Sequence, residues 1–165
     1  MKSLILKLNP SLKVKFLLLN QHHQELWRGN DRSFPDFWNT FLGWIVSLPN
    51  TYCFNNGLEM KRRFSSMKII FGGKTDRHHF SAIINNPSLS RGGKKRPSRV
   101  IIDDHDYSIY RVQRGNYFSL YDQDQKVFAM KKDHQYRDNF VSVFNDQLID
   151  EQLAAMIMVA LADSI

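Results

Sequence analysis

One ten-residue segment near the C-terminus limits the possible folds of this chain more than any other feature. Residues 153–162 read LAAMIMVALA, without one polar or charged side chain. Asp146, Asp150 and Glu151 precede the segment, where negative charge favours the start of a helix. A helix that is apolar on every face must be buried on every face. We therefore predict a helix within residues 146–165 that lies inside the protein.

Most of the remaining sequence consists of short runs in which apolar and polar side chains alternate, as in half-buried strands. The first run begins at Met1, and Lys7, Asn9 and Pro10 interrupt it, so we predict a strand and not an export signal. Turn residues such as Gly72-Gly73 separate several pairs of runs. The other predicted strands cover residues 12–18, 25–28, 67–71, 79–84, 99–102, 107–112, 117–121, 126–130 and 139–144.

Many short strands with no helical crossover between them indicate an antiparallel barrel or sandwich. In a β protein of this size, the inside of a closed sheet is the place that encloses a helix on all sides. The predicted fold is mainly β: a closed antiparallel β-barrel of about 10–12 short strands around the buried C-terminal helix. With 165 residues, the chain is expected to form a single domain, residues 1–165.

A second, shorter helix is predicted over residues 33–48. Ser33 is a suitable N-cap, Pro35 suits the first turn, and Pro49 ends the segment. The helix either plugs one end of the barrel or presents aromatic side chains to a membrane or a partner protein. The aromatic candidates for such a contact are Phe37, Trp38, Phe41 and Trp44.

The basic charge is concentrated in the middle of the chain. The formal net charge is +7, and residues 61–100 contain eleven Lys and Arg but one acidic residue, Asp76. Gly92 and Gly93 lie among the cations, so backbone amides could help to cradle a phosphate. This segment is expected to bind an anionic phospholipid or an acidic protein surface, or to be a solvated face. The candidate residues are Lys61, Arg62, Arg63, Lys68, Arg91, Lys94, Lys95, Arg96 and Arg99.

No residue pattern indicates catalysis or a cofactor. Asp103, Asp104, His105 and Asp106, with the pair His78-His79, have side chains that suit a divalent ion, but their spacing matches no metal motif, and paired Asp residues are ordinary turn formers. We expect no metal site. Sequence-specific nucleic-acid binding is not expected either, because no aromatic stacking residues are interleaved with the cations of the basic cluster at 91–99.

Two further features restrict the cellular setting. The single cysteine, Cys53, excludes an intramolecular disulfide and favours a reducing cytoplasm. The longest uncharged apolar run is residues 153–162, whereas a transmembrane helix needs about 20 residues, so no transmembrane span is expected.

The C-terminal part of the sequence resembles the tubby C-terminal-like superfamily, which includes the LURP-one-related and phospholipid scramblase-like proteins. The similar motifs are DYSIY at 106–110, YFSLYD at 117–122 and VFAMKK at 127–132, followed by the apolar helix that ends at Asp163. The resemblance implies an antiparallel barrel around a central helix. Some members of this superfamily bind phosphoinositides or associate with membranes through basic residues near the barrel wall.

These observations together predict a non-enzymatic binding or scaffold domain. We expect it to be cytoplasmic and to associate with anionic phospholipid headgroups at the inner membrane surface. The alternative is a module that binds a protein partner, such as an inhibitor, an immunity protein or an adaptor.

Overall fold

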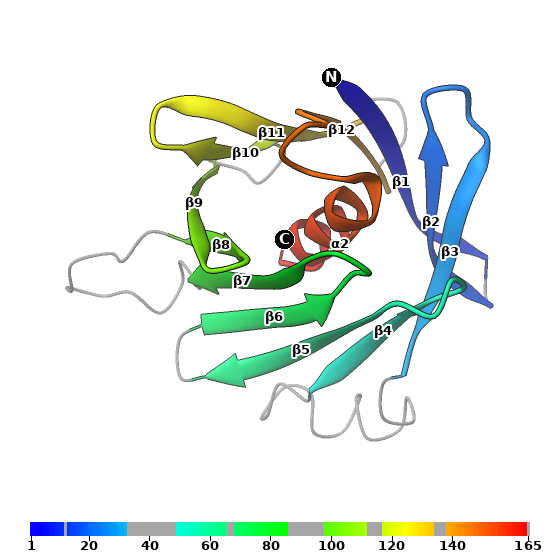
Figure 1. Ribbon diagram of the computed structural model, residues 1–165. Coiled ribbons are helices and arrows are strands. Elements are labelled where there is room, and N and C mark those ends of the chain that lie inside the picture. The colour runs from blue at the N-terminus through cyan, green and yellow to red at the C-terminus, as the bar shows by residue number, and fades with distance from the viewer. Residues whose placement is uncertain are drawn as a thin grey trace.

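Antiparallel strands surround one helix in the computed structural model, which describes residues 1–11, 13–32, 49–65, 68–85, 98–111, 117–133 and 138–164 (Figure 1). Each strand pairs with its neighbours in sequence, and β12 pairs with β1 to close the barrel. The prediction of a closed antiparallel barrel with a C-terminal helix is therefore confirmed. The strands are β1 (Lys2–Ser11), β2 (Val14–Asn20), β3 (Glu25–Asp31), β4 (Asn50–Phe54), β5 (Glu59–Ser65), β6 (Lys68–Lys74), β7 (His79–Asn85), β8 (Arg99–Ile102), β9 (His105–Arg111), β10 (Tyr117–Asp122), β11 (Gln125–Lys132) and β12 (Asn139–Phe144).

The central helix is α2 (Glu151–Asp163). Asp150 is its N-cap, and the side chain of Asp150 accepts a hydrogen bond from the backbone N–H of Leu153. Every residue from 153 to 162 is buried, as the sequence predicted, and α2 packs against β1, β7 and β12. The helix begins at Glu151 and not at 146, because the backbone carbonyl of Asn145 accepts hydrogen bonds that form a turn before it.

No helix in the described part of the chain is long and apolar enough to cross a bilayer. The second predicted helix, residues 33–48, lies outside the described residues, and so do its aromatic candidates Phe37, Trp38, Phe41 and Trp44.

Two inward-facing glycines allow the core to pack closely. A Cβ on Gly29 would lie 2.0 Å from the ring of Phe16 and 2.5 Å from the carbonyl oxygen of Cys53. A Cβ on Gly73 would lie 2.9 Å from the carbonyl oxygen of Glu59 and 3.2 Å from the sulfur of Met156 in α2. Real Cβ atoms do not approach backbone atoms this closely, so glycine lets the Phe16 ring and the helix rest directly on the barrel wall.

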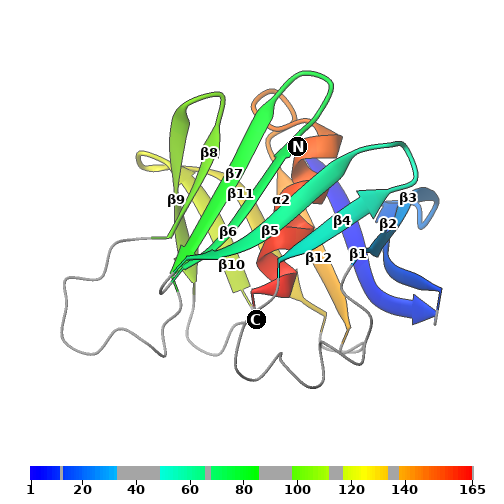
Figure 2. The same ribbon diagram turned by 90° about the horizontal axis from the view of Figure 1, so that it is seen from below.

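The barrel has two distinct ends (Figure 2). The hairpins β2–β3, β4–β5, β6–β7, β8–β9 and β10–β11 lie at the end where α2 begins, which we call the helix-start end. The opposite end, where α2 finishes, is the helix-finish end. The β8–β9 hairpin at the helix-start end has a two-residue turn. Asp103 and Asp104 both have positive φ, 47° and 69°, as a type I′ turn requires.

Candidate functional site

Four of the predicted basic residues lie on the outer wall of β5–β8. Inward residues such as Met60 and Phe71 are fully buried, so Lys61, Arg63 and Lys68 face outward. One row of paired residues crosses all four strands in the order Arg63, Ile70, Ile83, Arg99. Two half-buried isoleucines therefore lie between two cations. We call this surface the β5–β8 patch: Lys61, Arg63, Lys68, Ile70, Ile83 and Arg99.

The cations of the β5–β8 patch differ in how far they are neutralised. Arg99 donates a hydrogen bond of 2.9 Å to the Asp106 carboxylate, and both side chains are about half exposed. Lys61, Arg63 and Lys68 form no ion pair with any described residue. Their positive charge is therefore available to an external anion.

Arg62, the remaining cation of the 61–63 run, faces the barrel interior. Its Nη1 atom lies 2.6 Å from an Asp163 carboxylate oxygen at the end of α2, and the Tyr52 hydroxyl donates to the other oxygen at 2.5 Å. Burial opposes the charge of Arg62, yet the Asp163 carboxylate holds the Arg62 pKa above its ordinary value. Burial, followed by Asp163, raises the pKa of Tyr52. Arg62 therefore stabilises the fold and does not belong to the outer patch.

The four cations of the β7–β8 connection, Arg91, Lys94, Lys95 and Arg96, lie outside the described residues. By sequence they join the ends of β7 and β8, two strands of the β5–β8 patch.

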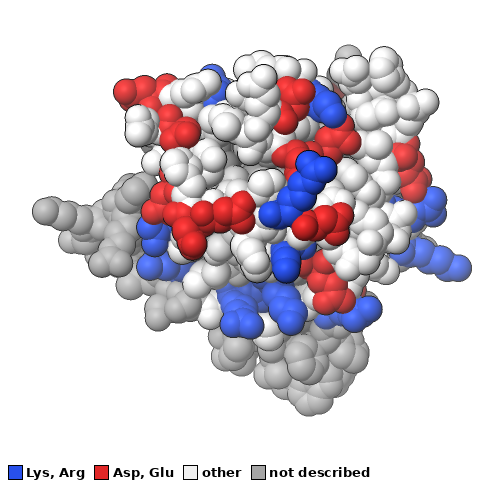
Figure 3. Space-filling view, in the orientation of Figure 1, with Lys and Arg blue, Asp and Glu red and all other residues white. Residues whose placement is uncertain are grey.

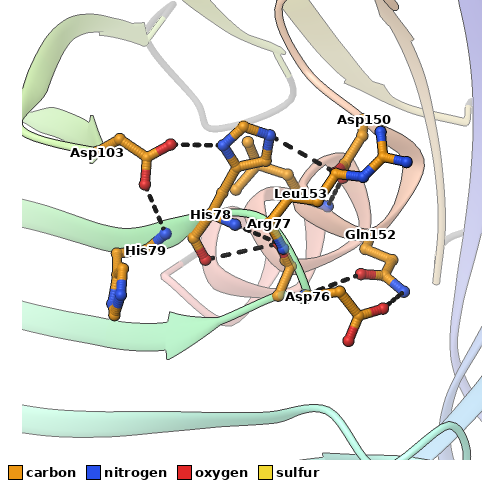
Figure 4. Close-up of polar contacts among 9 residues, drawn as sticks. Asp76, Arg77, His78, His79, Asp103, Asp150, Gln152 and Leu153 are labelled. Atoms are coloured by element: carbon orange, nitrogen blue, oxygen red, sulfur yellow. Dashed lines mark hydrogen bonds and ion pairs between the residues drawn. The ribbon is translucent and has the colours of Figure 1, made fainter.

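The side chain of His78 connects three segments at the helix-start end (Figure 4). Its Nδ1 atom lies 2.5 Å from Asp103 in the β8–β9 turn, and its Nε2 atom lies 3.7 Å from the N-cap residue Asp150. The second Asp103 oxygen accepts a hydrogen bond of 2.8 Å from the backbone N–H of His79. The hydrogen bond from His78, and then that from His79, lower the pKa of Asp103. The arrangement holds two hairpins against the start of the helix.

The acidic and histidine residues at 78–79 and 103–106 do not gather around one point. His78 contacts Asp103, whereas the His105 ring bonds to Asp122 at 3.0 Å in a shallow, open depression of the surface. Among the described residues, no group of three or more His, Cys, Asp or Glu could hold a metal ion. Burial raises the pKa of the Cys53 thiol, which disfavours the thiolate that a nucleophile would require.

We expect Asp103→Asn to reduce the stability of the fold at about pH 6 and to make the stability fall less steeply as the pH is lowered. Folding lowers the pKa of the Asp103 carboxyl below its unfolded value, 3.8. The ionised carboxylate therefore stabilises the folded state at pH values above 3.8, and this contribution is lost as the pH falls through the lower pKa of the folded state. The urea midpoints of the wild type and Asp103→Asn should therefore differ at about pH 6 and converge toward about pH 2. Asp104→Asn is the matched control, because the Asp104 side chain forms no hydrogen bond or ion pair with a described residue. Equal, pH-independent effects of the two changes would contradict the assignment.

Charge is divided between the two ends of the barrel. Figure 3 looks onto the helix-start end, where the acidic side chains spread over the surface while lysine and arginine gather mainly toward the lower part of the view. Acidic residues in the turns and element ends at the helix-start end include Asp76, Asp103, Asp104, Asp122, Asp124, Asp146, Asp150 and Glu151, and they outnumber the basic residues there, Lys2, Lys74, Arg77 and Lys126. Basic residues near the helix-finish end include Lys13, Arg63, Lys68, Arg99, Arg111, Lys131 and Lys132, and they outnumber the acidic residues described there, Asp31, Asp133, Asp138 and Asp163.

The described structure therefore defines a twelve-stranded up-and-down β-barrel with a filled, apolar centre and a polarised surface. No family model, no curated protein and no solved structure matches the chain. The resemblance to the tubby C-terminal-like superfamily stays a prediction, carried by the motifs at 106–132 and the terminal helix.

Proposed function

We propose that this protein is a non-enzymatic, tubby-like binding domain that associates with the cytoplasmic surface of membranes containing anionic phospholipid. The observation that carries the proposal is the row Arg63–Ile70–Ile83–Arg99 across the β5–β8 patch. The cations at its ends attract phosphate groups, and a cation without a described acidic partner, such as Arg63, contributes about 1 kcal/mol near an anionic membrane. The two isoleucines between them suit the boundary between headgroups and acyl chains.

The division of charge gives the bound barrel a defined orientation. An anionic membrane attracts the basic helix-finish end and repels the acidic turns at the helix-start end. Phe64, near the end of β5, is a large apolar side chain that is 38% exposed on the attracted side. The four cations at 91–96 belong by sequence to the connection between β7 and β8, two strands of the patch, and lie outside the described residues.

The proposal is tested by sedimentation with vesicles of phosphatidylcholine alone or with about 30% phosphatidylserine. Changing Lys61, Arg63 and Lys68 together to glutamine should weaken binding to the anionic vesicles about 100-fold, from about 1 kcal/mol for each charge. Binding should also weaken as the salt concentration rises, because exposed charges are screened. Vesicles of phosphatidylcholine alone should bind weakly.

The matched control is a triple glutamine change at Lys2, Lys74 and Arg77, which removes the same charge from the helix-start end of the barrel. It should weaken vesicle binding far less, because these residues lie at the end of the barrel that an anionic membrane repels. Equal effects of the two triple variants would show an unspecific charge effect. No binding to anionic vesicles would overturn the lipid proposal and favour an acidic protein partner.

A further inference from the structure

Three tyrosines from two strands form one surface cluster with a lysine on the outer face of β9–β11. The Tyr110 ring on β9 lies edge-to-face with the Tyr121 ring on β10, with ring centroids 5.0 Å apart. The Lys126 ammonium on β11 lies 6.0 Å from the Tyr117 ring centroid and 5.9 Å from that of Tyr121. Lys131 is the cross-strand partner of Tyr117. We call this cluster the tyrosine platform: Tyr110, Tyr117, Tyr121, Lys126 and Lys131.

The platform is ordered before any ligand binds. Ser119 faces outward between two inward residues, Phe118 and Leu120, yet it is only 3% exposed. The surrounding side chains therefore cover it as a packed layer. Lys126 donates a hydrogen bond of 3.3 Å to the Tyr117 hydroxyl, which fixes the lysine above the layer. Ligands that bind to ordered side chains lose less conformational entropy.

The platform also remains open to solvent and positively charged. Tyr110 is 60% exposed, which is high for a large side chain that already packs against another ring. The hydrogen bond to the Tyr117 hydroxyl, and then the charge interaction with that group, raise the pKa of Lys126, so its ammonium stays charged at neutral pH. An exposed aromatic face next to a fixed cation suits a ligand that carries both a planar ring and a negative charge.

We propose that the tyrosine platform binds single-stranded nucleic acid without sequence preference. A base stacks on the exposed Tyr110 ring, since every base has a π-face, and the flanking phosphates lie against Lys126 and Lys131. A duplex hides the faces of its bases inside the stack, so an outward-facing platform discriminates against it. This activity is independent of the proposed lipid binding, because the platform and the β5–β8 patch lie on different strands.

Fluorescence anisotropy with a labelled oligothymidylate of about 12 nucleotides, within the usual range of site sizes, measures the interaction. Tyr110→Ala should weaken binding about 5- to 150-fold, as expected for the loss of one stacked base. Tyr110→Phe keeps the ring and should bind nearly as well as the wild type, whereas Tyr110→Leu should behave like alanine. Lys126→Gln should lower the slope of log affinity against log salt by about 0.7.

Val143→Ala is the matched control, because Val143 is an exposed side chain, 45% accessible, on the neighbouring outer face of β12. It should leave oligothymidylate binding unchanged, and each variant should keep the circular dichroism spectrum and thermal midpoint of the wild type within a few degrees. The platform variants should keep their binding to anionic vesicles. The triple glutamine variant of the β5–β8 patch should lose vesicle binding and keep oligothymidylate binding.

Three results would overturn the inference. One is no measurable binding of oligothymidylate. Another is equal binding by the alanine, leucine and phenylalanine variants of Tyr110, which would show that no ring stacks. The third is equal affinity for a duplex of the same length, which would assign the interaction to phosphate charge alone.

Discussion

Ile157→Asp is expected to abolish cooperative folding of the barrel. Ile157 lies in the middle of α2 and is 0% exposed, with buried residues before and after it along the helix. An aspartate there would place a carboxylate in an apolar centre, at a cost of several kcal/mol. Because small domains are stable by about 5–15 kcal/mol, this change removes most or all of the stability. Near-ultraviolet circular dichroism and thermal unfolding should show no folded baseline at 25 °C.

Two further substitutions separate the effect of the introduced charge from the effect of burial. Ile157→Ala leaves a cavity without a charge and should cost about 2–5 kcal/mol, so the protein should still fold with a lower urea midpoint. Val143→Asp introduces the same carboxylate on the exposed face of β12, where the cost should stay near 1 kcal/mol or below. A well-folded Ile157→Asp variant would contradict a helix enclosed on all sides.

The central helix and most of the strands could be predicted because their signals are local. An unbroken apolar run has only one suitable environment in a small β protein, and alternation identifies strands one at a time. Two strands, β4 and β5, were absent from the prediction. β5 contains the run Lys61-Arg62-Arg63, which hides its alternation, and β4 is short. Asn56-Gly57, with φ of 87° at the glycine, is the hairpin signal that could have revealed both strands.

The surfaces could be predicted less well because they depend on contacts between distant residues. The sequence groups Arg62 with Lys61 and Arg63, yet its partner Asp163 lies 101 positions away. The sequence also groups His78 with His79, yet the His78 ring contacts the Asp103 carboxylate of another hairpin and not the His79 ring. The tyrosines of the platform come from motifs that indicate only the fold, and strand pairing brings them to Lys126. Side-chain direction and strand neighbours decide these sites, and neither is encoded in a short window of sequence.

Arg62→Ala is expected to be the most destabilising change among the basic residues, at about 3 kcal/mol. The variant leaves the Asp163 carboxylate, 24% exposed, without its ion pair. Asp163 also lies at the C-terminal end of α2, where the helix dipole opposes a negative charge. Tyr52 would remain as a hydrogen-bond donor, so Tyr52→Phe should cost less, about 1.5 kcal/mol. Urea unfolding at neutral pH measures both values.

Arg63→Ala is the matched control for this prediction, since Arg63 is the next residue, faces outward and pairs with no described acid. It should change the stability by less than about 0.5 kcal/mol. Two buried atoms near the pair, Arg62 Nε and Asn50 Oδ1, have no hydrogen-bond partner among the described residues, so the described part of this polar cluster is not fully satisfied. Replacing the pair together, with Arg62→Met and Asp163→Leu, should therefore recover much of the loss, because neither charge is then left alone. If Arg62→Ala were as mild as Arg63→Ala, or if the double variant were as unstable as the sum of its two single changes, the ion pair would not hold the end of the helix to β5.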